Sequence, residues 1–422
     1  MVTMKNRFGW SAAMIGLALM MVLAACGQPT AAEPPTPAPL TDTPLPPATA
    51  TPIPTPTPFP TATPLPDPTF PMHTAYFSYG IDVHLYYMDY EHVMGYVDKL
   101  GAEWTRQQVS WRDIEASKGQ YIWDELDNVV AVVGQHNRKL LVSIVRSPAW
   151  ATVDGSYGMP ADPIDLGDFL TAMATRYQGK IQAYEIWNEQ NYAVENDGLV
   201  EGAGRYVELL KVAYTAIKQV DPYAMVLFGP LTPTGTNNPA VAIPDVDYLQ
   251  AAYEYNDGEV RNYFDVLAAH SSGTHNPPDT LWPDNPGPYD QWLDDPTFYF
   301  RHVEQVRAVM EAYGDGDKQM WVTEFGWAST EGITDQPAEG YEYAQNNTAQ
   351  NQADYLVQAL EMGRTNYQPW MGAMFVWNLN FAPITTPNDE KAAFGLLDPS
   401  WEARLSFMAV KKYISQQTEW RP

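Results

Sequence analysis

Eight short apolar segments recur along the chain after residue 72, and this repetition constrains the fold more than any other feature of the sequence. Each segment has the length of a buried β-strand, and most of them begin 25 to 55 residues after the previous one. They are Tyr76–Asp82, Ala102–Gln108, Leu140–Val145, Ile181–Trp187, Ala224–Phe228, Phe264–His270, Met320–Glu324 and Gly372–Trp377. Spacing of this kind leaves room for a helix after each strand, which is typical of α/β domains.

Helical patterns do occupy most of these intervals. Between the fourth and fifth segments, apolar residues recur every three or four positions from Tyr206 to Val220, and the same spacing runs from Tyr355 to Leu360. Eight strand–helix units predict an α/β protein with a (β/α)8 TIM barrel over residues 72–422, the longer connections forming loops. A doubly wound open sheet is the alternative, but the first strand is not followed by the glycine-rich turn that would favour it.

The N-terminus has the order of an export signal. Lys5 and Arg7 precede an uncharged apolar run from Trp10 to Ala25, which is too short for a comfortable transmembrane span. The run ends in Leu-Ala-Ala-Cys-Gly, which resembles the lipobox of bacterial lipoproteins. The resemblance implies a signal peptide over 1–25, lipidation of Cys26, and a domain held outside the cell or in the periplasm by this lipid anchor alone. An uncleaved anchor, or an ordinary signal with an incidental cysteine, is the alternative.

Residues 26–71 have the composition of a linker. From Pro29 to Pro71 the chain has 17 Pro and 11 Thr in 43 residues, without Gly, Lys or Arg. Proline lacks a backbone N–H and fixes φ, so a run of Thr-Pro steps forms neither a helix nor a sheet ladder. We therefore expect a disordered, extended stalk.

Charge and cysteine content exclude several classes of protein. The chain has 24 basic and 51 acidic residues, a formal net charge of −27. This charge repels phosphate backbones and argues against nucleic acid as a partner, and also against a polyanionic substrate. A single Cys excludes a disulfide framework, a cysteine zinc site and an iron–sulfur cluster. We predict neither a metal nor a cofactor, and the sequence leaves the oligomeric state open.

Two glutamates follow strand segments, and strand ends are where a barrel carries its chemistry. Glu189 comes after the fourth segment in Trp-Asn-Glu-Gln-Asn, and Glu324 ends the seventh in Val-Thr-Glu-Phe-Gly-Trp. Enclosing a carboxylate is costly unless it is paired or has a function. The fourth and seventh strand ends face each other across the mouth of a barrel, so the two side chains are expected to converge. A pair of carboxyl groups is what cleavage of a glycosidic bond requires.

With these residues the domain resembles glycoside hydrolase clan A, in particular families 5 and 39, over most of residues 76–415. The resemblance implies that Glu189 is the general acid/base and Glu324 the nucleophile of a retaining mechanism, with carboxyl groups about 5–5.5 Å apart. It places Arg106, at the second strand end, among the substrate-binding residues and beside Glu324, where its charge would lower the pKa of that carboxyl. The pKa of Glu189 would be raised, so that it keeps its proton until the leaving group departs.

The same resemblance supplies further candidates for sugar binding. Asn188 would bond a sugar hydroxyl next to the scissile carbon, and Trp377 at the eighth strand end would form the floor of the subsite that holds the cleaved sugar. An indole matches the apolar face of a pyranose in shape and polarity. Trp150 and Trp327 are further candidates for the same kind of contact.

The sixth strand end departs from the family pattern. His270 matches the family's histidine, but Ser271 and Ser272 stand where many relatives have Pro-Tyr, so the tyrosine that bonds the nucleophile in those relatives is replaced here. Glu185 lies on the same side of its strand as Glu189 but two steps deeper, and we expect it to be an ion-pair partner inside the barrel.

The sequence thus predicts a surface-anchored retaining glycosidase that acts on β-linked oligo- or polysaccharides. The alternative from another class is a sugar-binding lipoprotein that kept the barrel and lost turnover, and a third is a barrel hydrolase acting on something other than sugar. The sequence decides neither the sugar and its linkage nor endo against exo cleavage.

Overall fold

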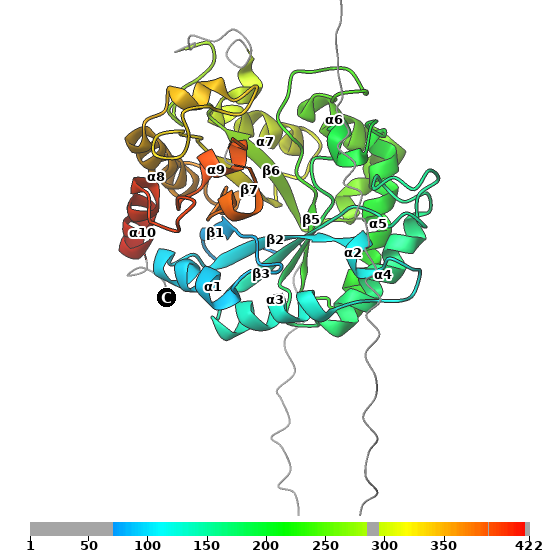
Figure 1. Ribbon diagram of the computed structural model, residues 1–422. Coiled ribbons are helices and arrows are strands. Elements are labelled where there is room, and N and C mark those ends of the chain that lie inside the picture. Colours follow the sequence, from blue (N-terminus) through cyan, green and yellow to red (C-terminus); the bar gives the residue numbers. More distant parts are fainter. Residues whose placement is uncertain (1–70, 285–294, 387, 418–422) are drawn as a thin grey trace, which may run out of the picture. The chain divides into compact units, whose positions relative to one another are not determined.

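Eight parallel strands form a closed barrel in the computed structural model, which describes residues 71–284, 295–386 and 388–417. The strands pair in the order of the sequence, β1 to β8, and β8 closes on β1. Figure 1 shows the strands at the centre and the helices around them. The predicted (β/α)8 TIM barrel is therefore confirmed. The predicted signal peptide, Cys26 and nearly all of the predicted linker lie outside the described residues.

Every strand overlaps one of the eight apolar segments. The strands are β1 (Ser78–Asp82), β2 (Trp104–Ser110), β3 (Lys139–Val145), β4 (Ala183–Ile186), β5 (Met225–Phe228), β6 (Val266–Ser272), β7 (Gln319–Gly326) and β8 (Met371–Val376). Strands of a parallel barrel are covered on both faces, which explains why they read as continuous apolar runs.

Helices follow the strands and bury one face each. The longer ones are α1 (Tyr90–Leu100), α3 (Asp124–Gln135), α4 (Pro163–Arg176), α5 (Ala203–Val220), α6 (Asp245–Glu254), α7 (Val303–Ala312), α8 (Ala349–Thr365) and α10 (Leu405–Gln417). Two short helices, α2 (Trp111–Ile114) and α9 (Glu390–Phe394), lie in the loops after β2 and β8. In α5 the predicted stripe, including Tyr206 and Leu210, is buried. Within the described ranges, no helix has both the length and the apolar character needed to cross a membrane.

Local sequence sets several helix starts. The side chain of Asp162 accepts a hydrogen bond from the N–H of Ile164, and Pro163 stands in the first turn of α4, where no N–H is needed. At α8, Thr348 and Asn351 form a reciprocal capping box.

The lower half of the barrel interior is packed with apolar side chains. Trp104 of β2 and Trp321 of β7 meet edge to face with ring centroids 5.0 Å apart. The cluster is completed by smaller residues from β3, β4, β5, β6 and β8: Leu141, Ala183, Leu227, Val266, Ala268, Ala373 and Phe375. This layer closes the barrel beneath the site, so chemistry is confined to its upper half.

Charged side chains form the layer above. Arg106 lies two residues after Trp104, and Glu185 two residues after Ala183; both are buried. Because side chains alternate along a strand, residues two apart point to the same interior. The barrel therefore changes from apolar to ionic within one strand step.

A β-bulge in β7 breaks this alternation. Ala269 of β6 is opposite Val322, but the next residue, His270, is opposite Glu324, so Thr323 is skipped. Simple alternation from inward-facing Trp321 would point Thr323 inward and Glu324 toward the helices. The bulge reverses this and brings Glu324 into the mouth of the barrel.

Gly80 of β1 makes room for the interior layer, and this can be tested. A Cβ at Gly80 would lie 2.2 Å from the ring of Phe375. We expect Gly80→Ala to lower the free energy of unfolding by about 1–3 kcal/mol, because the packed ring must shift. The measurement is denaturant unfolding followed by tryptophan fluorescence.

Gly95 in α1 is the matched control, because a Cβ there meets no atom within 4 Å. Gly95→Ala should be neutral or stabilise by about 0.5–1 kcal/mol, since alanine suits a helix interior better than glycine. Equal effects of the two substitutions would contradict the packing described for Gly80.

Candidate active site

Glu189 and Glu324 meet on the two sides of one imidazole. Nδ1 of His270 lies 2.8 Å from Oε1 of Glu189, and Nε2 of the same ring lies 3.5 Å from Oε1 of Glu324. Both carboxyl groups keep part of their surface exposed, 20% for Glu189 and 16% for Glu324. The predicted convergence of the two glutamates over one mouth is thus what the structure shows.

A strained turn after β4 aims Glu189 at this point. Trp187 has φ of 70° and Glu189 has φ of 46°, left-handed conformations that side chains with a Cβ rarely adopt. Two backbone hydrogen bonds hold the turn: Trp187 N–H donates to Ile144 O at 3.0 Å, and Glu189 N–H donates to Pro230 O at 2.8 Å. Strain of this kind persists where surrounding structure imposes it, and it is common at functional sites.

Arg106 lies beneath the pair and contacts three carboxyl groups. Its Nη1 donates to Oε1 of Glu324 at 2.5 Å and to Oδ1 of Asp82 at 2.8 Å, while Nη2 donates to Oε1 of Glu185 at 2.6 Å. The prediction for Glu185, an ion-pair partner inside the barrel, is confirmed. The side chain of Arg106 has no exposed surface, so the prediction that it is a substrate-binding residue is wrong; it acts through Glu324.

Burial dominates the proton affinities of the site. It raises the pKa of Glu189 to about 7, against the opposing effects of a hydrogen bond from Thr232 and the charge of Arg106. Burial also raises the pKa of Glu324, although His270 and Arg106 both pull it down. Arg106 lowers the pKa of Glu324, as its charge led us to expect, but desolvation is the larger effect and the net shift is upward. Burial lowers the pKa of His270, so its ring is neutral at neutral pH.

A third carboxyl group near Glu189 belongs to a residue that no sequence motif singled out. Glu195 is half-buried in the short helix η1 (Ala193–Asn196) of the loop after β4. Burial and the charge of Glu189 raise its pKa to about 7, and a hydrogen bond with Asn188 opposes this. Asn188 also accepts from Nη2 of Arg106 at 2.8 Å. Asn188, 4% exposed, therefore links the buried arginine to the open loop.

Thr232 is a second residue missed from the sequence. It is half-buried in the loop after β5 and is hydrogen-bonded to Glu189 through its side chain. Neither Thr232 nor Glu195 belongs to a motif, and only the folding of neighbouring loops over β4 brings them to Glu189.

The three tryptophan candidates lie in different environments. Trp377 is half-buried after β8, and its ring meets Phe381 edge to face at 4.8 Å. Trp150 is half-buried too, but its Nε1 donates to the backbone of Glu115 at 2.8 Å, within the loops after β2 and β3. Trp327 is fully buried and donates to Asn276 O, so its ring offers no surface to a ligand. The prediction that Trp327 contacts a sugar is wrong, because its side chain packs into the core behind β7.

The side chain of Ser271, the residue after His270, faces the surrounding protein and not the two glutamates. Ser271 is buried and its hydroxyl donates to Phe300 O at 2.9 Å, away from the glutamates.

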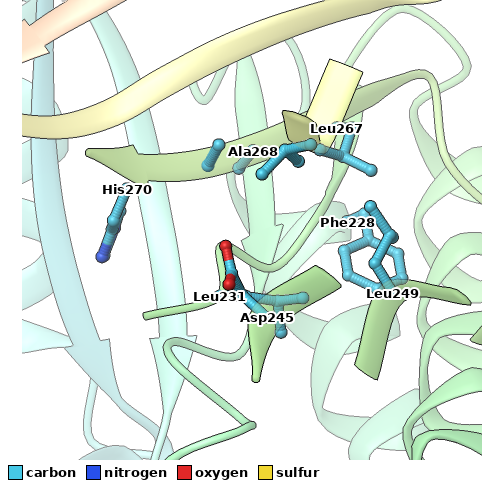
Figure 2. A pocket seen from close by; sticks show the side chains of 9 residues that line it. Phe228, Leu231, Asp245, Leu249, Leu267, Ala268 and His270 are labelled. Atoms are coloured by element: carbon cyan, nitrogen blue, oxygen red, sulfur yellow. The ribbon is translucent and has the colours of Figure 1, made fainter. Parts of the chain in front are cut away.

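A small cavity of about 10 Å³ lies behind β6, against α6 and α7. Figure 2 shows His270 at one end of this cavity and Phe228 and Leu249 at the other. It has room for one water molecule at most and is not a sugar subsite.

Among the described residues, no group of three or more His, Cys, Asp or Glu side chains is arranged to hold a metal ion. The carboxyl groups of the site are partnered instead by the guanidinium of Arg106 and the imidazole of His270.

Comparison with known proteins gives a likeness of fold. No family model matches the chain, and neither does any curated protein. Among solved structures, a family 39 glycoside hydrolase from Bacteroides cellulosilyticus WH2 superposes with a TM-score of 0.59 at 20% identity, over 81% of this chain and 64% of that one. A glucosidase from Croceicoccus marinus gives 0.57 at 12% identity, over 82% and 68%.

A family 39 β-xylosidase from Caulobacter crescentus gives a TM-score of 0.52 at 19% identity, over 80% of this chain and 71% of that one. The chain therefore spans less than two thirds of the Bacteroides protein and somewhat more of the other two. The structural neighbours include clan A glycosidases of family 39, as the sequence led us to expect, and at these identities what is shared is the barrel.

We predict that removal of Arg106, which three carboxyl groups share, lowers the stability of the protein in a pH-dependent way. Arg106→Met leaves the carboxyl groups of Asp82, Glu185 and Glu324 without their cation, and we expect the free energy of unfolding to fall by about 3–5 kcal/mol at pH 7. The pKa values of Asp82 and Glu324 are already raised by burial and rise further without Arg106. Such groups favour the folded state when protonated, so the loss should shrink as pH falls from 7 to 5.

Arg138→Met is the control, because Arg138 pairs with Asp98 at the surface. Its effect should stay below about 1 kcal/mol and change little over the same pH range. A deficit of Arg106→Met that grows on acidification would contradict the described network. The measurement is thermal unfolding at several pH values.

Proposed function

We propose that this protein is a retaining glycoside hydrolase that cleaves β-linked oligo- or polysaccharides by double displacement. The observation that carries the proposal is the pair Glu189 and Glu324, held on either side of His270 at the mouth of the barrel. One carboxyl group has a pKa near neutrality and the other is hydrogen-bonded to a buried arginine. This asymmetry separates a proton donor from a nucleophile.

In the first step the carboxylate of Glu324 attacks the anomeric carbon. The bond between that carbon and the glycosidic oxygen breaks, and the proton of Glu189 passes to the departing oxygen. Arg106 holds Oε1 of Glu324, which fixes the carboxylate in place and leaves its other oxygen for the sugar.

In the second step Glu189, now ionised, removes a proton from water. The water oxygen attacks the anomeric carbon, the bond to Glu324 breaks, and Glu189 regains its proton. Anomeric configuration is retained because the carbon is attacked twice from opposite faces.

His270 couples the two carboxyl groups. A neutral imidazole carries one N–H, so it donates to one partner and accepts from the other. When Glu189 holds a proton, Nδ1 accepts from it and the N–H at Nε2 faces Glu324. This arrangement favours the protonation states that the first step needs.

Half-buried Trp377 supplies the aromatic surface for the cleaved sugar. The first substrates to try are β-xylosides and β-glucosides, because the structural neighbours include a β-xylosidase and a glucosidase. For the location we retain the lipoprotein hypothesis: the sequence around Cys26 supports lipidation, and residues 26–71 would hold the barrel away from a membrane.

Substitution of the two glutamates tests their roles. Glu324→Gln should lower kcat on aryl β-glycosides by at least about 10³-fold, because no nucleophile remains. Glu189→Gln should be nearly as harmful with an alkyl glycoside but far milder with an activated aryl leaving group, which departs without a proton. Initial rates on paired substrates measure both effects, and NMR of the first-formed product checks that the anomer is retained.

Glu361→Gln, an exposed substitution on α8, is the control and should keep the parent rate. If both site variants keep parental rates, the proposal fails. If the parent protein binds sugars but turns over none of these substrates, the sugar-binding alternative is favoured.

The pH profile provides an independent test. The pKa of Glu189 is about 7, and the first step needs its protonated form, so kcat/KM for an alkyl glycoside should fall about tenfold per pH unit above 7. Burial raises the pKa of Glu324, so the acid limb should lie above the ordinary glutamate range. Glu189→Gln assayed with an activated leaving group should lack the alkaline limb. Persistence of that limb in the variant would assign it to another group.

A further inference from the structure

Two arginines near the site form no ion pair and no side-chain hydrogen bond within the described part of the chain. Arg112 and Arg146 are the two described arginines whose guanidinium groups make neither a hydrogen bond nor an ion pair with another described residue; the other nine make at least one. Arg261, Arg364 and Arg404 also lack a carboxylate partner, but they bond to carbonyl or hydroxyl oxygens, so guanidinium groups left without any such acceptor are conspicuous. Guanidinium groups pair well with planar anions such as carboxylates.

The two arginines lie together at the open end of the barrel. Arg112 is in α2, directly after β2, and Arg146 directly follows β3. The N–H of Arg112 donates to Arg146 O at 3.0 Å. Their guanidinium carbons are 5.9 and 5.6 Å from the ring centroid of Tyr157. Two like charges are therefore gathered around one aromatic ring, an arrangement that an anion between them would stabilise.

Arg146 lies on the Glu189 side of the mouth. Glu195, in the loop after β4, interacts electrostatically with both Glu189 and Arg146. The ring of Tyr157 is anchored to the same loop, because its hydroxyl donates to Val194 O at 3.3 Å and its N–H donates to Asp197 at 3.1 Å. In the proposed mechanism Glu189 protonates the leaving group, so this side of the mouth receives the leaving group.

The backbone holds Arg146 in place. Arg146 has φ of 61°, in the left-handed region, although glycine is not present there. Ser147 N–H donates to Tyr157 O at 3.1 Å, which ties the turn to the loop that carries the aromatic ring. This backbone hydrogen bond and the one between Arg112 and Arg146 fix the point from which the exposed side chain of Arg146 projects next to Tyr157.

We infer that Arg112, Arg146 and Tyr157 form a subsite for an anionic substituent, the carboxylate of a uronic acid or a sulfate ester, carried by the leaving-group part of the substrate. The inference deepens the proposed function. It rests on that function in one respect, namely that the bound glycan is a substrate. The ring of Tyr157 would support the sugar that carries the anion, and the two guanidinium groups would bind the charge.

The subsite fits one charge rather than many. Glu195 and Asp197 flank it, and the net charge of −27 opposes the approach of a polyanionic chain. A mostly neutral glycan with one acidic branch would be attracted by the two arginines and would be repelled little by the net charge of the protein.

A matched pair of ligands tests the inference without turnover. The protein is the full chain with Glu324→Gln, and the ligands are β-1,4-xylo-oligosaccharides with one glucuronic acid branch and the same oligosaccharides after reduction of the carboxyl group to an alcohol. Calorimetry should show at least about tenfold tighter binding of the acidic member, as expected for hydrogen bonds to a charged group. A singly sulfated oligosaccharide and its desulfated form make the second arm, which separates the two sources of anion.

Variants assign the effect to these arginines. Arg146→Gln and Arg112→Gln should each reduce the acidic-to-neutral preference, the double variant should abolish it, and Arg146→Lys should keep part of it. Arg176→Ala is the control, since it removes an exposed arginine that also packs on an aromatic ring but pairs with Asp127. Thermal unfolding checks that the variants stay folded.

Equal affinity for both members in both arms, or no binding of any of these ligands, would overturn the inference. A preference that survives the double variant would overturn it as well. The proposed function fails separately: a parent protein that turns over no glycoside but shows the arginine-dependent preference loses its enzymatic role and keeps its anionic subsite.

Discussion

The ionic contact of Arg106 with Asp82, Glu185 and Glu324 is the interaction on which the site depends. One guanidinium at the centre of the barrel joins strands β1, β2, β4 and β7 and reaches Asn188 in the turn after β4. A buried arginine is tolerated because every direction of its fork meets an acceptor. Burial raises the pKa values of Asp82 and Glu324, and the charge of Arg106, shared among three carboxyl groups, only partly opposes this.

This cluster stands between a dry interior and an open mouth. Below it, Trp104 and Trp321 fill the barrel; above it, Glu189 and Glu324 are partly exposed on the two sides of His270. The low polarity beneath explains why desolvation exceeds the attraction of the arginine for both glutamates. The same enclosed geometry keeps His270 neutral, with Nδ1 hydrogen-bonded to Glu189 and Nε2 3.5 Å from Oε1 of Glu324. The position of the ionic cluster between the apolar interior and the mouth thus accounts for the pKa shifts of the site.

The loops after β2, β3 and β4 extend the site outward on the Glu189 side. Glu195 interacts with Glu189 and Arg146, and Tyr157 ties the arginine-bearing turns to the loop of η1. On the other side, Trp377 and Phe381 line the end of β8. A barrel keeps its catalytic layer fixed by the strands while loops change what is bound, which is why the loop residues carry specificity.

The sequence by itself determined the barrel, because eight buried strands and the amphipathic helices between them are encoded in local apolar patterns such as Tyr206 to Val220. Strand order and period also located Glu189, Glu324 and Glu185, whereas Arg106 and His270 followed from the resemblance to clan A glycosidases. Only the tertiary structure decided what depends on contacts between distant segments: the bulge that turns Glu324 inward, the burial of Trp327 and Arg106, and the approach of Thr232 and Glu195 to Glu189. Neither strand period nor motif records these, because a bulge is set by pairing with the neighbouring strand and burial is set by whichever loops fold over the residue.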